Sequence, residues 1–134
     1  MRSQTFTCGK APYLVSAAAA FCGQDVVLIV GGGTVPHIGA IAVAMPRPSL
    51  SPGGRPSASA SVICALGHKD DLPARDAALR LSSVLGVTVT VTVGLHVDDA
   101  AVQDIRLLQA NFTQIIGEAE AWLLRNQDKS VSDF

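Results

Sequence analysis

The chain has 134 residues, of which 49% are hydrophobic and only 16% are charged, and its net charge is −1. A chain of this length predicts one domain over residues 1–134, with an ordered core over about 5–125 and a frayed tail over 126–134. The near-zero net charge and the scarcity of aromatic residues argue against nucleic-acid binding, because both a basic surface and stacking platforms are missing.

The apolar stretches are short. The run Tyr13–Cys22 is one of the longest, and it is only about half the length of a membrane-spanning helix, which needs about 20 residues. The three cysteines, Cys8, Cys22 and Cys64, are widely spaced and form no CxxC pair, which indicates reduced thiols rather than a disulfide framework. We therefore expect a cytoplasmic protein that does not enter a membrane.

The first half of the chain predicts mostly strands. Val26–Val30 is rich in β-branched residues and continuously apolar, as is typical of a central strand buried on both faces. The three glycines Gly31–Gly33 follow it and predict a turn whose backbone is open to close approach. Four prolines and two glycines predict a mobile loop over Pro46–Pro56. Further strands are expected at Thr5–Cys8, Tyr13–Phe21 and Ile38–Ala44.

The second half predicts two alternating strands and two helices. Ser57–Ala65 and Val87–Val93 alternate small hydroxyls with apolar residues, which is typical of strands. Helices are expected over about Asp71–Leu85, ended by Gly86, and over about Asp99–Arg125. We interpret the apolar stripe of the last helix as core: Ile105, Leu108, Phe112, Ile115, Ala119 and Trp122. The element order predicts an α+β sandwich, with one mainly antiparallel sheet and two helices against it.

Three histidines stand out because each lies near a glycine at the end of a strand. His37 follows the glycine run, His68 lies in Gly67–Asp71, and His96 lies in Gly94–Asp99, so one sheet edge can bring them into one pocket. Histidines in such a pocket can bind a transition metal with a water, bind phosphate, move protons near neutral pH, or make only loop hydrogen bonds. A metal site is less favoured because no HxH or HxxxH pair is present.

The acidic pairs Asp70–Asp71 and Asp98–Asp99 follow two of these histidines. Their expected role is to cap the two helices, and a second role is to hold the neighbouring imidazole in one tautomer. No pair of carboxylates suggests a hydrolase.

The candidates for binding an anion are few. The amides of Gly32 and Gly33 can cradle a phosphate if they are exposed, although the sequence matches neither a Walker A motif nor a Rossmann fingerprint. Arg47 can bind a phosphate through two hydrogen bonds or can be a solvated loop residue, and the sequence does not decide between them. Arg55 is expected to be solvated.

Four blocks resemble the small LpdD-like proteins, which accompany UbiD-type (de)carboxylases of hydroxybenzoic acids such as gallate. The resemblance covers about residues 5–120, and its most specific part is the PHIG…PRPSL block. The resembling blocks are Gly33–Leu50, Ser57–Ser61, Gly67–Asp71 and Gly94–Asp98.

The resemblance implies a non-catalytic chaperone that helps a UbiD-type decarboxylase acquire or mature prenylated FMN. It also implies a fold similar to small proteasome-assembly chaperones, which commonly dimerise, and a homodimer is expected on that ground and from the apolar composition. It assigns no residue roles, so His37, Arg47, His68 and His96, with Gly32 and Gly33, are cofactor-binding candidates on chemical grounds. Two alternatives stay open: a metal-binding protein or enzyme that uses His37, His68 and His96, and an assembly chaperone that binds only a partner protein.

Overall fold

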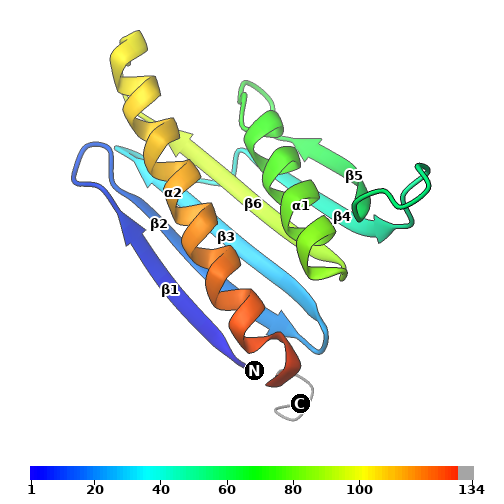
Figure 1. Cartoon of the computed structure of the whole chain (residues 1–134). Helices are drawn as coiled ribbons and strands as arrows, with labels where there is room; N and C mark the ends of the chain where they lie inside the picture. Colours follow the sequence, from blue (N-terminus) through cyan, green and yellow to red (C-terminus); the bar gives the residue numbers. More distant parts are fainter. Residues whose placement is uncertain (130–134) are drawn as a thin grey trace.

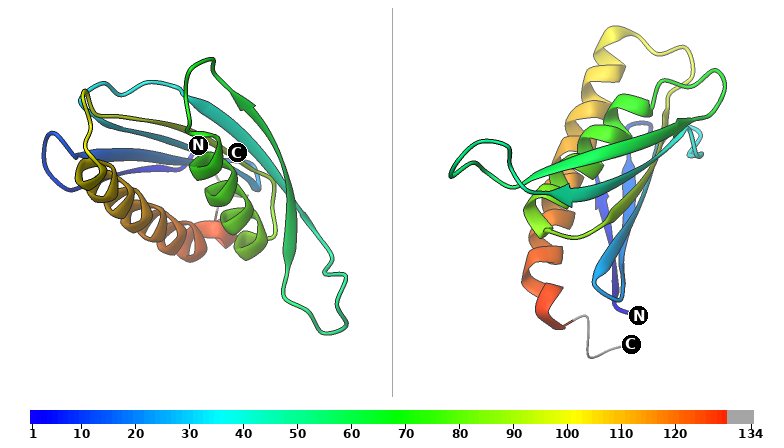
Figure 2. Two further views of the ribbon diagram at one scale, coloured as in Figure 1. Left: turned by 90° about the horizontal axis from the view of Figure 1, so that it is seen from above. Right: turned by 90° about the vertical axis from the view of Figure 1, so that its right-hand side faces the viewer.

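Six strands form one sheet, and two helices pack against one of its faces, in the computed structural model, which describes residues 1–129 (Figure 1). Figure 2 shows that the opposite face of the sheet carries no helix. The strands are β1 (Ser3–Cys8), β2 (Val15–Cys22), β3 (Asp25–Gly33), β4 (Ala40–Arg47), β5 (Ser57–Cys64) and β6 (Val89–His96). The helices are α1 (Asp71–Leu85) and α2 (Val102–Asn126), and a short 3₁₀ turn, Gln127–Lys129, follows α2.

The strand order is β1-β2-β3-β6-β4-β5, and every neighbouring pair is antiparallel except β3 with β6. Helix α2 packs on β1 and β2, and helix α1 packs on β6, β4 and β5. The predicted α+β architecture is therefore confirmed. Among the described residues, no helix is both long and apolar enough to cross a bilayer.

Alternation along the central strands sorts their side chains between the two faces. Val89, Val91 and Val93 of β6 are fully buried beneath the helices, whereas Thr90 and Thr92 face the other way. The uncovered side of the sheet, which we call the open face, carries one continuous row across five strands. In register, that row is Ala18, Ile29, Thr92, Ile41 and Ile63.

The glycine run does not form the predicted turn. Strand β3 continues to Gly33 and pairs on both sides, so Gly32 lies opposite Val15 of β2 and Leu95 of β6. The glycines are needed because other backbone lies too close for a side chain. A Cβ on Gly33, whose φ is +88°, would lie 1.8 Å from the carbonyl oxygen of His96.

The segment between β3 and β4 lies directly against the end of the sheet. A Cβ on Gly94 of β6 would lie 1.8 Å from the carbonyl oxygen of His37, and a Cβ on Gly31 would lie 3.2 Å from Pro36. Because these two positions carry no side chain, the backbone at His37 can cross the sheet at close range. The glycines thus place a candidate functional histidine.

Boundaries also differ from expectation at the end of β4 and in the tail. Strand β4 runs to Arg47 through Pro46, which the sequence assigned to a loop; the shorter loop 48–56 projects from the body of the molecule (Figure 2). The expected frayed tail begins with an ordered turn, because the side chain of Gln127 donates to the carbonyl of Leu85 at 2.6 Å. Residues 130–134 of that tail lie outside the described residues.

Helix α2 begins three residues later than predicted, so Asp98 and Asp99 do not cap it. Its first turn is instead fixed by Asp104, whose carboxylate accepts hydrogen bonds from the amide of Ala101 at 2.8 Å and from the hydroxyl of Tyr13 at 2.6 Å. The hydroxyl of Tyr13 lowers the pKa of Asp104, and the same hydrogen bond raises the pKa of Tyr13. This contact ties the β1–β2 connection to the start of α2.

We predict opposite effects for two glycine substitutions. Gly94→Ala forces the backbone at His37 away from the sheet and should lower the free energy of unfolding by about 2–3 kcal/mol. Gly117→Ala, inside α2, meets only Arg80 Nη2 at 4.0 Å and should raise it by about 0.5–1 kcal/mol. Urea denaturation measures both, and a Gly94→Ala variant as stable as wild type would contradict the close approach.

Candidate functional site

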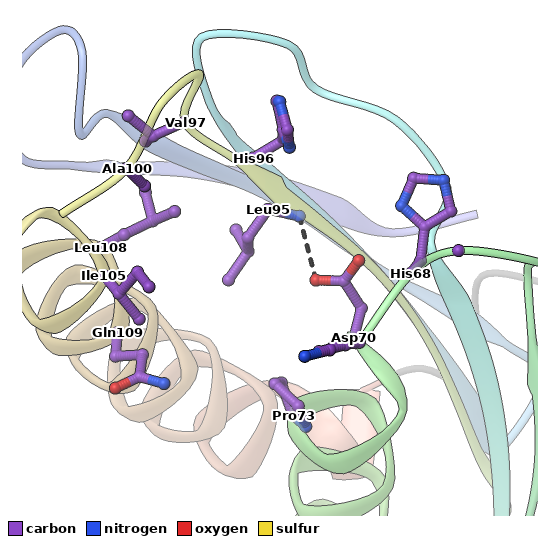
Figure 3. A pocket seen from close by; sticks show the side chains of 12 residues that line it. His68, Asp70, Pro73, Leu95, His96, Val97, Ala100, Ile105, Leu108 and Gln109 are labelled. Atoms are coloured by element: carbon purple, nitrogen blue, oxygen red, sulfur yellow. Dashed lines mark hydrogen bonds between the residues drawn. The ribbon is translucent and has the colours of Figure 1, made fainter. Parts of the chain in front are cut away.

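A cavity of about 410 Å³ lies where strand β6 ends and both helices begin (Figure 3). Its walls are mostly apolar and come from the end of β6, from the loop that follows it, and from the first turns of α1 and α2. Polar groups from the loop before α1 complete it. The lining residues are Gly67, His68, Lys69, Asp70, Pro73, Leu95, His96, Val97, Ala100, Ile105, Leu108 and Gln109.

Asp70 is the buried polar residue at the centre of this end of the sheet. Pairing between β4 and β6 continues to Gly39, whose amide donates to the carbonyl of Val93 at 2.9 Å. Beyond that point β4 supplies no acceptor, and Oδ1 of Asp70 accepts the amide of Leu95 at 3.2 Å (dashed in Figure 3). Asp70 holds the expected capping position of α1, but its side chain makes no capping hydrogen bond and bonds to the sheet instead.

The second carboxylate oxygen of Asp70 faces a pair of histidines. Oδ2 lies 3.4 Å from Nε2 of His37, and the same Nε2 lies 2.9 Å from Nδ1 of His68. The other ring nitrogen of His37, Nδ1, lies 3.0 Å from the carbonyl oxygen of Val35 and donates to it. The two rings are close and tilted, with centroids 4.4 Å apart. We call His37, His68 and Asp70 the histidine–aspartate triad.

His96 lies beside the triad, but its ring contacts a different carboxylate, that of Asp98. Its Nε2 lies 3.0 Å from Oδ1 of Asp98, and Oδ2 of Asp98 accepts the hydroxyl of Thr34 at 3.1 Å. The ring centroid of His96 is 6.3 Å from that of His37. Asp98 therefore orients an imidazole, the second role considered for the acidic pairs, and does not cap helix α2.

The structure brings the three predicted histidines together but separates them from the predicted phosphate ligands. Arg47 pairs with Ser57 at the far end of β4, whereas Ala40 at the near end pairs with Cys64. The expected cradle of loop amides is absent at Gly33, because its amide donates to the carbonyl of Leu14 within the sheet. Gly32 likewise lies within the paired part of β3.

Sequence reasoning missed two apolar contributors to the site and one contact of Asp70. Ile105 and Leu108 were assigned to the core stripe of α2, but both line the cavity, and Ile105 is 47% exposed. Asp70 was expected to cap α1, with orienting the neighbouring imidazole as a second role, and its hydrogen bond to the Leu95 amide was not foreseen. The position of Asp70 in the sequence could have indicated its place in the site. Asp70 comes two residues after His68 and just before a helix, so its carboxylate lies near that histidine.

The architecture defines a class of small α+β protein, with one sheet covered by two helices on one face. Among solved structures, the chain is similar to a chain from the crystal structure of a novel chaperone complex for yeast 20S proteasome assembly, with a TM-score of 0.57. The sequences are 19% identical, and the likeness covers 94% of this chain and 96% of that one. At this identity the likeness shows the fold alone.

The sequence comparisons are more specific. The profile described as the prenylated flavin chaperone LpdD-like domain matches residues 9–124, so the chain belongs to this family. It is also 27% identical over 119 residues to Protein LpdD of Lactiplantibacillus plantarum (strain ATCC BAA-793 / NCIMB 8826 / WCFS1), covering 89% of this chain and 84% of that protein. The predicted family is confirmed, and the protein is a chaperone rather than an enzyme.

The two roles of Asp70 predict different costs for two substitutions. Asp70→Ala removes the acceptor of the Leu95 amide and should destabilise the protein by about 1–3 kcal/mol, the cost of an unsatisfied buried group. Asp70→Asn keeps an oxygen for that amide and offers a donor to Nε2 of His37, so it should cost less. Thermal unfolding of both variants checks the order, and equal losses would contradict the role of the Leu95 hydrogen bond.

Proposed function

We propose that this protein binds prenylated FMN in the cavity at the end of β6 and hands it to a UbiD-type decarboxylase of hydroxybenzoic acids, such as gallate, in the cytoplasm. Membership of the prenylated flavin chaperone family is the observation that carries the proposal. The proposed site follows from the cavity, because it is the place where apolar walls and polar groups meet beside the histidines.

The cavity fits the two chemical parts of this cofactor. Its volume of about 410 Å³ lies within the range of small-molecule pockets, about 300–1,000 Å³. Leu95, Val97, Ile105 and Leu108 offer apolar surface to a prenylated ring system. No serine, threonine or cysteine is among the described residues that line the cavity, which suits a carrier that must release its cargo.

The phosphate is assigned to the polar side of the cavity. Lys69 supplies a positive charge there, and His68 and His96 supply ring nitrogens that can donate to phosphate oxygens. Arg47, the phosphate ligand considered from the sequence, lies at the other end of β4. The family's cofactor is thus proposed to lie with its phosphate near Lys69 and its ring against α2.

Filling the cavity should abolish the chaperone effect. The assay is the activity and cofactor occupancy of the decarboxylase, co-expressed with a flavin prenyltransferase, with and without this protein. Ala100→Phe places a large ring on the cavity wall and should reduce occupancy to the level seen without the protein. Ala110→Phe, exposed on α2 and not part of the cavity lining, is the matched control and should support full occupancy.

Two results would contradict this proposal in different ways. Equal cofactor occupancy with and without the protein would contradict the chaperone role for the flavin. A full effect with Ala100→Phe would move the cofactor away from the cavity. The protein could instead bind the decarboxylase and assist the assembly of that enzyme without changing its cofactor occupancy. That result would favour an assembly chaperone that binds only a partner protein.

We also propose that the protein is a homodimer whose two copies meet through their open faces. The helices cover the other side of the sheet (Figure 2), and within the described part of the chain the segment between β3 and β4 crosses this face only near its end, at Gly31 and Gly94. It carries large apolar side chains that are substantially exposed: Ile29 is 54%, Met45 is 58% and Ile63 is 74% exposed. Exposed apolar surfaces of this kind mark protein–protein contacts, and a second copy offers a self-complementary one.

A charge in the open face should separate the dimer. Light scattering should give twice the chain mass of 13.8 kDa for the wild type and the single mass for Ile29→Lys, because burying that charge between two sheets is costly. Leu72→Lys is the control, since Leu72 is 62% exposed on α1 and lies away from the open face. A monomeric wild type at micromolar concentration would contradict the dimer.

A further inference from the structure

We propose that the histidine–aspartate triad binds one divalent transition-metal ion, such as Zn²⁺, through Nε2 of His37, Nδ1 of His68 and Oδ2 of Asp70. One possible ligand atom from each of the three residues lies within 4.8 Å of the others. Imidazole nitrogens with a carboxylate oxygen form a donor set that suits Zn²⁺ and related ions. The inference goes beyond the flavin role and does not depend on it.

The two donor separations at Nε2 of His37 fit one central ion. Metal–ligand bonds of about 2.1 Å place neighbouring donors about 3.0 Å apart in octahedral geometry and about 3.4 Å apart in tetrahedral geometry. The distance from Nε2 of His37 is 2.9 Å to Nδ1 of His68 and 3.4 Å to Oδ2 of Asp70. His68 is exposed, so its ring can move to bring its nitrogen nearer to the carboxylate of Asp70 around an ion.

Contacts behind two of the ligands hold them in the form that a metal requires. Nδ1 of His37 donates to the carbonyl of Val35, so the neutral ring presents the lone pair of Nε2 to the triad. Oδ1 of Asp70 is fixed by the amide of Leu95, which leaves Oδ2 free to bind. Metal ligands are commonly oriented by such second contacts to backbone groups.

Hydrogen bonds between the neutral rings of His37 and His68 leave one unfavourable contact in the triad. If His68 donates to Nε2 of His37, the carboxylate oxygen of Asp70 faces the same acceptor nitrogen at 3.4 Å. Asp70 is only 6% exposed, so water compensates little for this unfavourable contact. A cation at the meeting point turns all three groups into ligands and removes the conflict.

The proposed donor set differs from the three-histidine set considered from the sequence. His96 is paired with Asp98, and its ring lies farther from His37 than the ring of His68 does. Three protein ligands leave at least one coordination position open. His68 and Asp70 also line the cavity, so a molecule bound there can reach the open coordination position of the metal. The expected ligand at that position is an anionic oxygen of the bound molecule, from a phosphate or a carboxylate.

The test is metal binding by the full chain, produced without a histidine tag and stripped with a chelator. Calorimetric titration with Zn²⁺ and the visible absorption of bound Co²⁺ should both report one ion per chain. His37→Ala, His68→Ala and Asp70→Asn should each weaken binding on the order of 100-fold, while His96→Ala should leave it unchanged. Circular dichroism confirms that each variant is folded, and Asp70→Asn keeps the hydrogen bond to Leu95.

Three outcomes would overturn the proposal. They are no stoichiometric binding by wild type, binding that all three triad variants retain, and binding that His96→Ala abolishes, which would restore the three-histidine set. No readout uses the flavin or the decarboxylase. A failure of the metal site is therefore distinguishable from a failure of the chaperone function.

Discussion

Strands β4 and β6 stop pairing where Gly39 donates to Val93, and from that point the carboxylate of Asp70 accepts the next amide, that of Leu95. This one hydrogen bond joins the start of α1 to the end of β6 and directs the second carboxylate oxygen at His37. It depends in turn on glycine, because a Cβ on Gly39 would lie 1.9 Å from Oδ2 of Asp70. The cavity and the triad both exist because the sheet is completed by a side chain at this position.

Patterns with a local cause were predictable from the sequence. Alternation located β5 and β6, and Pro73 with Gly86 located α1 almost to the residue. The glycine run of β3 was not predictable in this way, because the need for those glycines comes from distant backbone: the carbonyl of His96 blocks a side chain at Gly33. A glycine that favours a turn and a glycine required by nearby backbone from another element cannot be told apart in a single sequence.

The site shows the same division. Placing the histidines at strand ends next to glycines was enough to predict that they gather. The role of Asp70 depends on the exact place where β4 diverges from β6, and the exposure of Ile105 depends on where α2 begins relative to β6. Arg47 shows the opposite case. It is close to His37 in sequence, but the extended strand β4 places it at the other end of the sheet from the histidines.

Binding of the family's cofactor at the end of the sheet that holds the cavity and the triad can be tested by NMR. We expect the chemical shifts of backbone amides, recorded while prenylated FMN is titrated into the protein, to change most at Lys69, Leu95 and Ala100. The shifts at the far end of β4, at Arg47 and Ser57, should remain unchanged. Perturbations concentrated at Arg47 and the neighbouring loop 48–56 would contradict it.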